Sequence, residues 1–291
     1  MPCLIRKAVI PAAGLGTRLL PATKETPKEM LPIFARTRDG GTCLKPVLQA
    51  VFEQLYDVGV REFYFVVGRG KRAIEDHFTP DSGFLGVLKE KNKNEAVSDL
   101  QAFYEKVEGS TIIFVNQPKP AGFGDAVLKS KPLMKGDFLV YAGDTYIISH
   151  ENNYLTRLMA THEKEKAQAS FIVKEVENPR RFGVIEANNI GEDILEVKRA
   201  VEKPERPPTN LAIMPAYVFN PTIFEALEEC KLGVGGELQL TDGIQKLIEW
   251  GRRVIAVKLK PNDLWLDIGT SKTFWNALTI SYQYSQGEQN R

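Results

Sequence analysis

The feature of this sequence that most constrains its fold is a repeated alternation of short apolar runs with amphipathic stretches. Lys7–Ala13 and Glu62–Val67 are short and apolar, as buried strands are, whereas Pro46–Val58 places its apolar residues on one helical face. The same reasoning predicts two more strands and four more helices: Thr111–Val115 and Phe138–Ala142, then Lys71–Phe78, Glu95–Val107, Gly124–Lys131 and Tyr154–Lys166. This alternation is typical of an α/β protein with a mostly parallel sheet covered by helices on both faces.

The second half of the chain changes character, because strands there follow one another with few helices between them. Strands are expected at Ser170–Val176, Gly183–Glu186, Ile194–Lys198, Leu211–Phe219 and Arg253–Val257, and helices at Pro221–Glu229, Thr241–Trp250 and Ser271–Tyr284. The proline-rich Lys203–Pro208 and the polar Ala35–Thr42 are expected to be loops. We expect one domain over 1–291, with a nucleotide-binding half (1–145) and a sugar-binding half with C-terminal helices (146–291).

Charge and cysteine content exclude several classes of function. The 38 basic and 37 acidic residues give a formal charge of +1, so no global field favours nucleic acid or a membrane surface. No apolar run reaches the roughly 18 residues that a membrane-spanning helix needs. Cys3, Cys43 and Cys230 are isolated, which argues against disulfides and zinc. A cytoplasmic protein is expected, and a homo-oligomer is favoured.

The first strand runs into a glycine loop, Ala12-Ala13-Gly14-Leu15-Gly16-Thr17-Arg18. Glycines let a backbone approach a ligand and turn its N–H groups toward phosphate oxygens. Thr17-Arg18 arrives too early for a Walker loop, and Leu19 stands where a dinucleotide fingerprint needs a third glycine. By itself the loop is equally consistent with a tight turn between a strand and a helix.

A rigid basic segment follows this loop. Arg18, Lys24 and Lys28 are interleaved with Pro21, Pro27 and Pro32, and the prolines prevent a regular helix. Several fixed cations beside a glycine turn suit a triphosphate. The alternative is a surface loop with ordinary lysines.

Two motifs here resemble a known family. Gly14-Leu15-Gly16-Thr17-Arg18-Leu19-Leu20-Pro21, followed by Pro27-Lys28-Glu29-Met30-Leu31-Pro32, is similar to the signature of the sugar nucleotidylyltransferases. Ala22-Thr23-Lys24 and Lys28–Pro32 look most like the bacterial-type enzymes that join UTP to glucose 1-phosphate. The resemblance extends from Lys7 to about Leu278. It implies a Rossmann-like mixed sheet with a smaller, β-rich sugar-binding subdomain.

The resemblance also implies roles for residues of the first half. The backbone of the glycine loop would contact the base and phosphates, at Ala13, Gly14, Gly16 and Thr17. Arg18 and Lys28 would hold the β- and γ-phosphates. Gln117 and the backbone of Gly122, in the segment Gln117–Gly124, would read the base, since an amide can both donate and accept. Without the resemblance, Gln117 would be interpreted as a strand-end amide paired with backbone.

Two aspartates match the metal ligands of the family. Asp144 follows a buried strand in Ala142-Gly143-Asp144-Thr145, and Asp267 lies in Trp265-Leu266-Asp267-Ile268-Gly269-Thr270. Mg²⁺ prefers one or two carboxylates together with waters and substrate phosphates. The alternative is that each aspartate caps the helix after it. The sequence alone does not show that the two meet.

The sugar side of the family maps onto Gly183, Glu202, Lys203 and Asn210. Lys203 would hold the sugar phosphate, Glu202 would accept from sugar hydroxyls, and Gly183 would let the backbone approach the ring. Gly236-Glu237-Leu238-Gln239-Leu240-Thr241-Asp242 also resembles a family segment, with Thr241 expected to cap a helix.

The expected reaction is attack by the sugar phosphate on the α-phosphorus of the nucleotide, with Arg18, Lys28, Asp144 and Lys203 as catalytic residues and Mg²⁺ as cofactor. Gly143 and the Trp-Leu-Asp-Ile-Gly-Thr run lean toward the thymidylyl branch, so dTTP stays an alternative to UTP. A catalytically silent, nucleotide-sugar-binding regulatory protein on the same fold is the other alternative. The missing third glycine argues against a metal-free nucleotide-binding module.

Overall fold

A computed structural model describes residues 5–287 of the chain. Cys3, which was expected to form neither a disulfide nor a zinc site, lies outside these residues, whereas Cys43 and Cys230 are both free and half-buried. Within the described residues no helix is long and apolar enough to cross a membrane.

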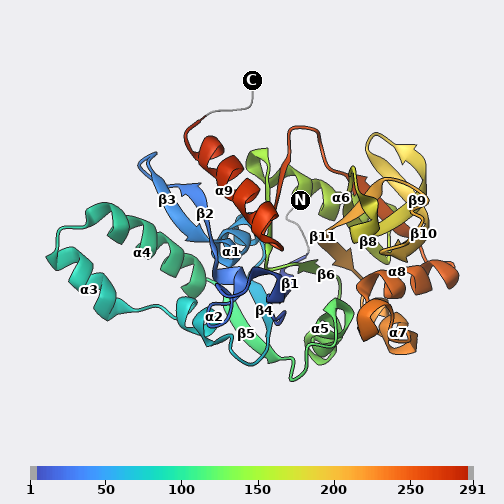
Figure 1. The fold of residues 1–291 in the computed structure, drawn as a ribbon, viewed down its shortest axis with the longest axis horizontal. Helices are drawn as coiled ribbons and strands as arrows, with labels where there is room; N and C mark the ends of the chain where they lie inside the picture. The colour runs from blue at the N-terminus through green and yellow to red at the C-terminus, as the bar shows by residue number, and fades with distance from the viewer. Residues whose placement is uncertain (1–4, 288–291) are drawn as a thin grey trace.

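One sheet runs through both halves of the described chain (Figure 1). Its spatial order is β5-β4-β1-β6-β11-β8-β12-β10-β9. The strands of this sheet are β1 (Lys7–Pro11), β4 (Glu62–Val67), β5 (Thr111–Asn116), β6 (Phe138–Tyr141), β8 (Ala169–Glu175), β9 (Gly183–Gly191), β10 (Ile194–Glu202), β11 (Leu211–Phe219) and β12 (Val254–Lys258). The first four strands in this order are mutually parallel, and from β11 onward the pairing is mixed. The predicted mixed α/β architecture is confirmed, with its parallel part in the N-terminal half.

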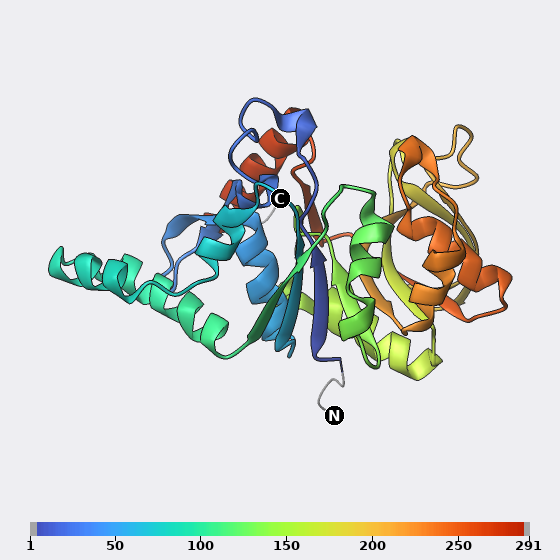
Figure 2. The ribbon, with the colours of Figure 1, turned by 90° about the horizontal axis from the view of Figure 1, so that it is seen from below.

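Helices cover both faces of this sheet (Figures 1 and 2). They are α1 (Val47–Asp57), α2 (Arg72–His77), α3 (Ser82–Glu90), α4 (Asn94–Glu108), α5 (Phe123–Lys129), α6 (Asn153–Glu165), α7 (Thr222–Glu229), α8 (Leu240–Glu249) and α9 (Ser271–Ser285). Apolar residues of α1, α2, α4 and α6 belong to one core cluster, and those of α5, α7 and α8 to another.

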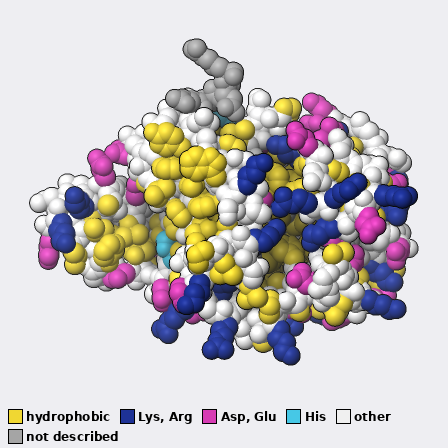
Figure 3. All heavy atoms as spheres, in the orientation of Figure 1, with side chains coloured by type: hydrophobic (Ala, Val, Ile, Leu, Met, Phe, Trp, Pro, Cys, Tyr) yellow, Lys and Arg dark blue, Asp and Glu magenta, His cyan; other side chains and the backbone are white. Residues whose placement is uncertain are grey.

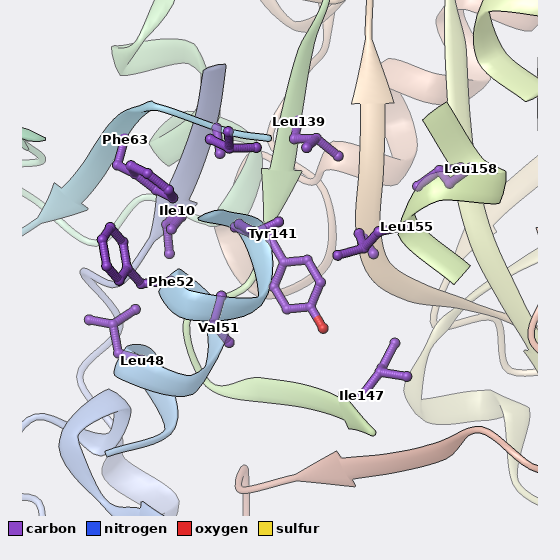
Figure 4. Close-up of a cluster of buried hydrophobic side chains, with 14 of the residues drawn as sticks. Ile10, Leu48, Val51, Phe52, Phe63, Leu139, Tyr141, Ile147, Leu155 and Leu158 are labelled. Atoms are coloured by element: carbon purple, nitrogen blue, oxygen red, sulfur yellow. The ribbon is translucent and has the colours of Figure 1, made fainter. Parts of the chain in front are cut away.

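Alternate residues of each central strand enter opposite cores, because successive side chains of a strand point to opposite faces. In β6, Leu139 and Tyr141 join the first cluster, whereas Phe138 and Val140 join the second. Figure 4 shows Leu139 and Tyr141 beside α1 and α6 in the first cluster. All four residues of β6 are fully buried, so this strand is fixed from both sides and its carboxyl end is a rigid support.

Two small sheets lie beside the main one. The strands β2 (Pro32–Arg36) and β3 (Thr42–Pro46) form a hairpin, and β7 (Thr145–Ile148) pairs with β13 (Leu264–Asp267). Ala35–Thr42 was therefore wrongly predicted as a loop at its ends, since only its tip is a turn. The helix α9 packs on β2, and the Arg36 guanidinium donates to the carbonyls of Tyr284 and Ser285, at the end of that helix.

The helix α3 and the strands β7 and β13 were not predicted. In β7 and β13 only four residues pair, which is too short for a period-2 pattern to stand out in the sequence. In α3 no residue is fully buried, so tertiary burial leaves little signal in its composition. Figure 1 shows α3 and α4 together as an arm that projects from the body.

Candidate active site

The glycine loop leaves β1 at the carboxyl edge of the parallel strands. Gly16 has φ of +66°, and a Cβ there would lie 3.2 Å from Cβ of Thr23. The Thr23 hydroxyl donates to the Gly16 carbonyl at 2.8 Å and closes the loop on itself. The predicted base- and phosphate-contacting Ala13, Gly14, Gly16 and Thr17 thus belong to one compact turn, followed by the short 3-10 helix η1 (Thr17–Leu19).

Lys28 is brought back to this turn by the basic segment. It begins the 3-10 helix η2 (Lys28–Met30), and a Cβ on Gly14 would lie 3.4 Å from its Nζ. Its ammonium donates to Oδ2 of Asp144 at 2.5 Å. A predicted phosphate ligand and a predicted metal ligand, 116 residues apart in sequence, are therefore in direct contact.

Asp144 and Asp267 come together through a strand pair that the sequence did not reveal. The register of β13 on β7 sets Asp267 opposite Thr145, and the Ile268 N–H donates to the Asp144 carbonyl at 3.5 Å. Arg18 reaches the same place, because a Cβ on Gly269 would lie 3.4 Å from its guanidinium. Neither aspartate caps a helix: α9 is capped by Thr270, and Oδ1 of Asp267 accepts from the Gly269 N–H at 2.9 Å.

The charges at this edge control one another's titration. Burial opposes the ionised form of Asp144, but the Lys28 ammonium, its hydrogen bond and the Arg18 guanidinium act together against burial and lower the pKa of that carboxyl. Burial likewise opposes the charged form of Lys28, and Asp144 with Glu29 raises its pKa. Burial raises the pKa of Asp267, and the neighbouring Asp144 carboxylate adds to that rise. A divalent cation between the two carboxylates would relieve their mutual repulsion.

A buried ion pair behind Lys28 was not predicted from the sequence. Glu29 is 1% exposed and Lys71 is 7% exposed, and Nζ of Lys71 lies 2.8 Å from Oε2 of Glu29. Gly143 lies beside this pair, and a Cβ there would lie 3.0 Å from Cδ1 of Leu48, 3.3 Å from the Pro11 carbonyl oxygen and 3.4 Å from Cγ of Glu29. The signal that pointed here was the motif Lys28-Glu29, in which only the lysine had been given a role.

The predicted base reader Gln117 directly follows β5 and is almost completely buried. Its Nε2 donates to the Gly122 carbonyl at 3.2 Å and to Oδ2 of Asp125 at 2.7 Å. Gly122 has φ of +112°, and a Cβ there would lie 2.5 Å from the Leu238 carbonyl, so only glycine fits. Gly68, which follows β4, lies between Gln117 and Ala13 and joins this loop to the glycine turn.

The predicted sugar side forms a second cluster. The Thr241 hydroxyl donates to Oε2 of Glu202 at 2.6 Å, and Nζ of Lys203 lies 2.9 Å from Oε1 of the same carboxylate. Gly183 is packed against Thr241 and Glu202, since a Cβ at this position would lie 2.7 Å from the Thr241 hydroxyl and 3.0 Å from Oε2 of Glu202. Lys203 has φ of +41°, an unfavourable value for a side-chain-bearing residue.

Two expectations about the sugar side differ from the structure. Thr241 does not cap α8. That helix begins at Leu240, and the Thr241 hydroxyl donates to Glu202 instead. Asn210 is exposed, and its one hydrogen bond within the described chain is made by its carbonyl, which accepts from the Val176 N–H. The structure therefore does not bring its side chain into the cluster of Glu202, Lys203 and Thr241.

The two clusters face each other across the junction of the halves. Phe182, beside Gly183, makes an edge contact with Trp265 of β13, with ring centroids 5.6 Å apart. The loop after Gln117 contacts the segment before Thr241, because the Gly124 N–H donates to the Leu238 carbonyl at 2.9 Å. On the face shown in Figure 3, Lys and Arg side chains gather around a hollow between the two halves.

The donor set at Asp144 and Asp267 fits a magnesium ion. Among residues 5–287 no group of three or more His, Cys, Asp and Glu side chains is arranged around a common point, as a protein-only metal site would require. Two carboxylates that repel each other are a donor set that Mg²⁺ accepts when substrate phosphates and water complete its coordination.

The comparison with protein families decides which group this site belongs to. The model of the family described as "Nucleotidyl transferase" matches residues 7–283, which is nearly the whole chain. The chain belongs to the nucleotidyl transferase family. The predicted resemblance is confirmed.

Relatives within the nucleotidyl transferase family are similar over most of their length. A UTP–glucose-1-phosphate uridylyltransferase of Bacillus subtilis is 41% identical over 84% of this chain and 81% of its own. A second protein of that name, from Pseudomonas aeruginosa, is 35% identical over 97% of both chains. A solved structure of a UDP-glucose pyrophosphorylase complexed with UDP-glucose has a TM-score of 0.83 at 32% identity, over 97% of this chain and all of the other.

Proposed function

We propose that this nucleotidyl transferase moves a uridylyl group from UTP to glucose 1-phosphate and releases pyrophosphate. The observation that carries the proposal is the contact of Lys28 with Asp144 beside Asp267 and Arg18. Two cations and two carboxylates from distant segments form a site whose charges suit phosphate groups and a divalent ion together. The choice of UTP and glucose 1-phosphate follows the names of the relatives at 35–41% identity.

The main difficulty of this reaction is the approach of two anions. An oxygen of the sugar phosphate attacks the α-phosphorus, and pyrophosphate leaves in line, so no enzyme nucleophile is required. Arg18 and Lys28 hold the β- and γ-phosphates and offset the charge that develops on the leaving group. The N–H groups of the turn formed by Gly14 and Gly16 support the same phosphates.

The sugar phosphate is held from the opposite half. Lys203 binds the phosphate of the sugar phosphate. Glu202 accepts hydrogen bonds from sugar hydroxyls, and Thr241 fixes the orientation of the Glu202 carboxylate. Gly183 leaves room for the ring. Asn210 was also expected to bind the sugar; that role would need its exposed side chain to turn toward Glu202.

The metal belongs to this proposal. Asp144 and Asp267 would hold Mg²⁺, which supplies charge neutralisation between the reacting phosphates when it is bound. The Lys28 ammonium also donates to Asp144 and so contributes positive charge at the same place.

The test is pyrophosphate release from a grid of UTP, dTTP, CTP and GTP with glucose 1-phosphate, with and without magnesium. Turnover with UTP that depends on magnesium is expected. Preference for dTTP would assign the chain to the thymidylyl branch, and the absence of turnover with every pair would favour a catalytically silent, regulatory protein.

We also propose how the chain is organised and where it acts. Residues 1–145 are proposed to serve the nucleotide and 146–291 the sugar. Free thiols at Cys43 and Cys230 support a cytoplasmic location, and the exposed aromatic residues of α9, Trp275, Tyr282 and Tyr284, support self-association into a homo-oligomer. Light scattering would test the latter.

A further inference from the structure

The orientation of the Gln117 amide is fixed by its neighbours. The residue is 4% exposed, and its backbone N–H donates to the Val67 carbonyl at 2.8 Å, which anchors the backbone. Both atoms that surround Nε2 are acceptors: the Gly122 carbonyl oxygen and a carboxylate oxygen of Asp125. The amide turned by 180° would place Oε1 against two other oxygens, so chemistry permits only one orientation.

Asp125 is itself held in place. It lies in the first turn of α5, and its side chain is 15% exposed. One carboxylate oxygen accepts from Gln117, and the other lies 3.1 Å from Nζ of Lys129. A carboxylate between an amide and an ammonium is a strong, fixed acceptor. Nothing in the sequence pattern around Asp125 had indicated a role for it.

This arrangement leaves Oε1 as the atom of the Gln117 amide that can bind a ligand. Its amide has two hydrogens, and the Gly122 carbonyl and Asp125 accept both. Only Oε1, an acceptor, can then face a ligand beyond the end of β5. Uracil and thymine present a donor, N3–H, between two carbonyls, whereas the same atom of cytosine is an acceptor.

We propose that Asp125 is a positioning residue that holds Gln117 with Oε1 toward the nucleotide base and thereby selects uracil or thymine over cytosine. This inference rests on the proposed function, because it assumes that Gln117 reads the base. A cytosine in this place would set its N3 against Oε1 and leave both acceptors unpaired. A site built for a hydrogen bond rejects an analogue that cannot make it by at least about a hundredfold.

The same geometry predicts no choice between uracil and thymine. The two bases present an identical edge to Oε1, and the methyl group that distinguishes them lies elsewhere on the ring. The mechanism therefore concerns the exclusion of CTP, and it holds for an enzyme that uses UTP or dTTP.

The experiment measures kcat/KM for UTP, dTTP and CTP with glucose 1-phosphate in wild type and three variants. In Asp125→Ala the amide is free to turn, and we expect the ratio of UTP to CTP to fall at least tenfold. Asp125→Asn retains an oxygen that can accept from Nε2, so its ratio should stay within about threefold of wild type. Lys129→Met, the matched control on the same helix, should do the same, since the contact between Asp125 and Gln117 survives.

The outcomes separate this inference from a structural role and from the proposed function. An Asp125→Ala variant that loses UTP and CTP turnover equally, or keeps the wild-type ratio, overturns the inference. An Asn variant as unselective as the Ala variant does so too. Melting temperatures check folding, and Asp125→Ser replaces the Ala variant if that one does not fold. Wild-type turnover with dTTP alone would contradict the proposed substrate, yet a fall in the ratio of dTTP to CTP in Asp125→Ala would still support the role of Asp125.

Discussion

The buried pair of Glu29 and Lys71 gives the most exact test of how this site is supported. Their side chains are 1% and 8% exposed, and the charged atoms lie 2.8 Å apart. Removal of one partner leaves the other charge buried without compensation, which costs about 3–5 kcal/mol. Replacement of both by apolar residues of similar volume is close to neutral, because both desolvation costs disappear together.

We therefore expect Glu29→Met and Lys71→Met each to lower the free energy of unfolding by about 3–5 kcal/mol. For a chain of this size that corresponds to a loss of roughly 6–10 °C in melting temperature. The double variant should melt within a few degrees of wild type, so the two effects are strongly non-additive. Thermal and urea unfolding followed by circular dichroism would measure all four proteins.

The pH dependence of the single variant gives a second check. Burial raises the pKa of Glu29 above its ordinary value of 4.5, against the opposing effect of Lys71. In Lys71→Met that opposing effect is lost, so the folded pKa rises further above the unfolded one. Stability from this group is then present below pH 4.5 and is lost as the pH rises through the folded pKa. The double variant should lack this slope. Additive losses, or single variants that melt within about 2 °C of wild type, would refute the reasoning.

Three further predictions concern the site and the thiols. Asp144→Asn should lower kcat at least about 100-fold, measured as pyrophosphate release, and near-normal turnover with magnesium would remove Asp144 from the metal site. Thr241→Val frees the Glu202 carboxylate, so KM for glucose 1-phosphate should rise roughly tenfold; an equal rise in KM for UTP would contradict this. Burial raises the pKa of Cys230 to about 11, so its alkylation by iodoacetamide at pH 8 should be roughly 100-fold slower than that of a small thiol and should accelerate as the pH rises. A rate equal to that of glutathione would show that this thiol is not protected.

The sequence alone determined the central elements of the fold and predicted a set of site residues. The strands β1, β4 and β6 were predictable because an uninterrupted apolar run between turn residues is a local property. The motif from Gly14 to Pro32 was equally local, and it pointed to the family that the comparison confirmed. The roles of Arg18, Lys28, Asp144 and Lys203 remain predictions that rest on the resemblance to that family.

Only the tertiary structure decided which of these residues meet. Asp267 reaches Asp144 through β13 and β7, whose pairing joins segments more than a hundred residues apart and leaves no periodic trace in either. Glu29 and Lys71, which are 42 residues apart, are likewise brought together only in the folded chain, whereas Gln117 and Asp125 meet across a turn of eight residues. The physical reason is that the apolar and polar pattern of a segment reflects which of its residues are buried or exposed. Contacts between segments depend instead on the order and register of the assembled strands.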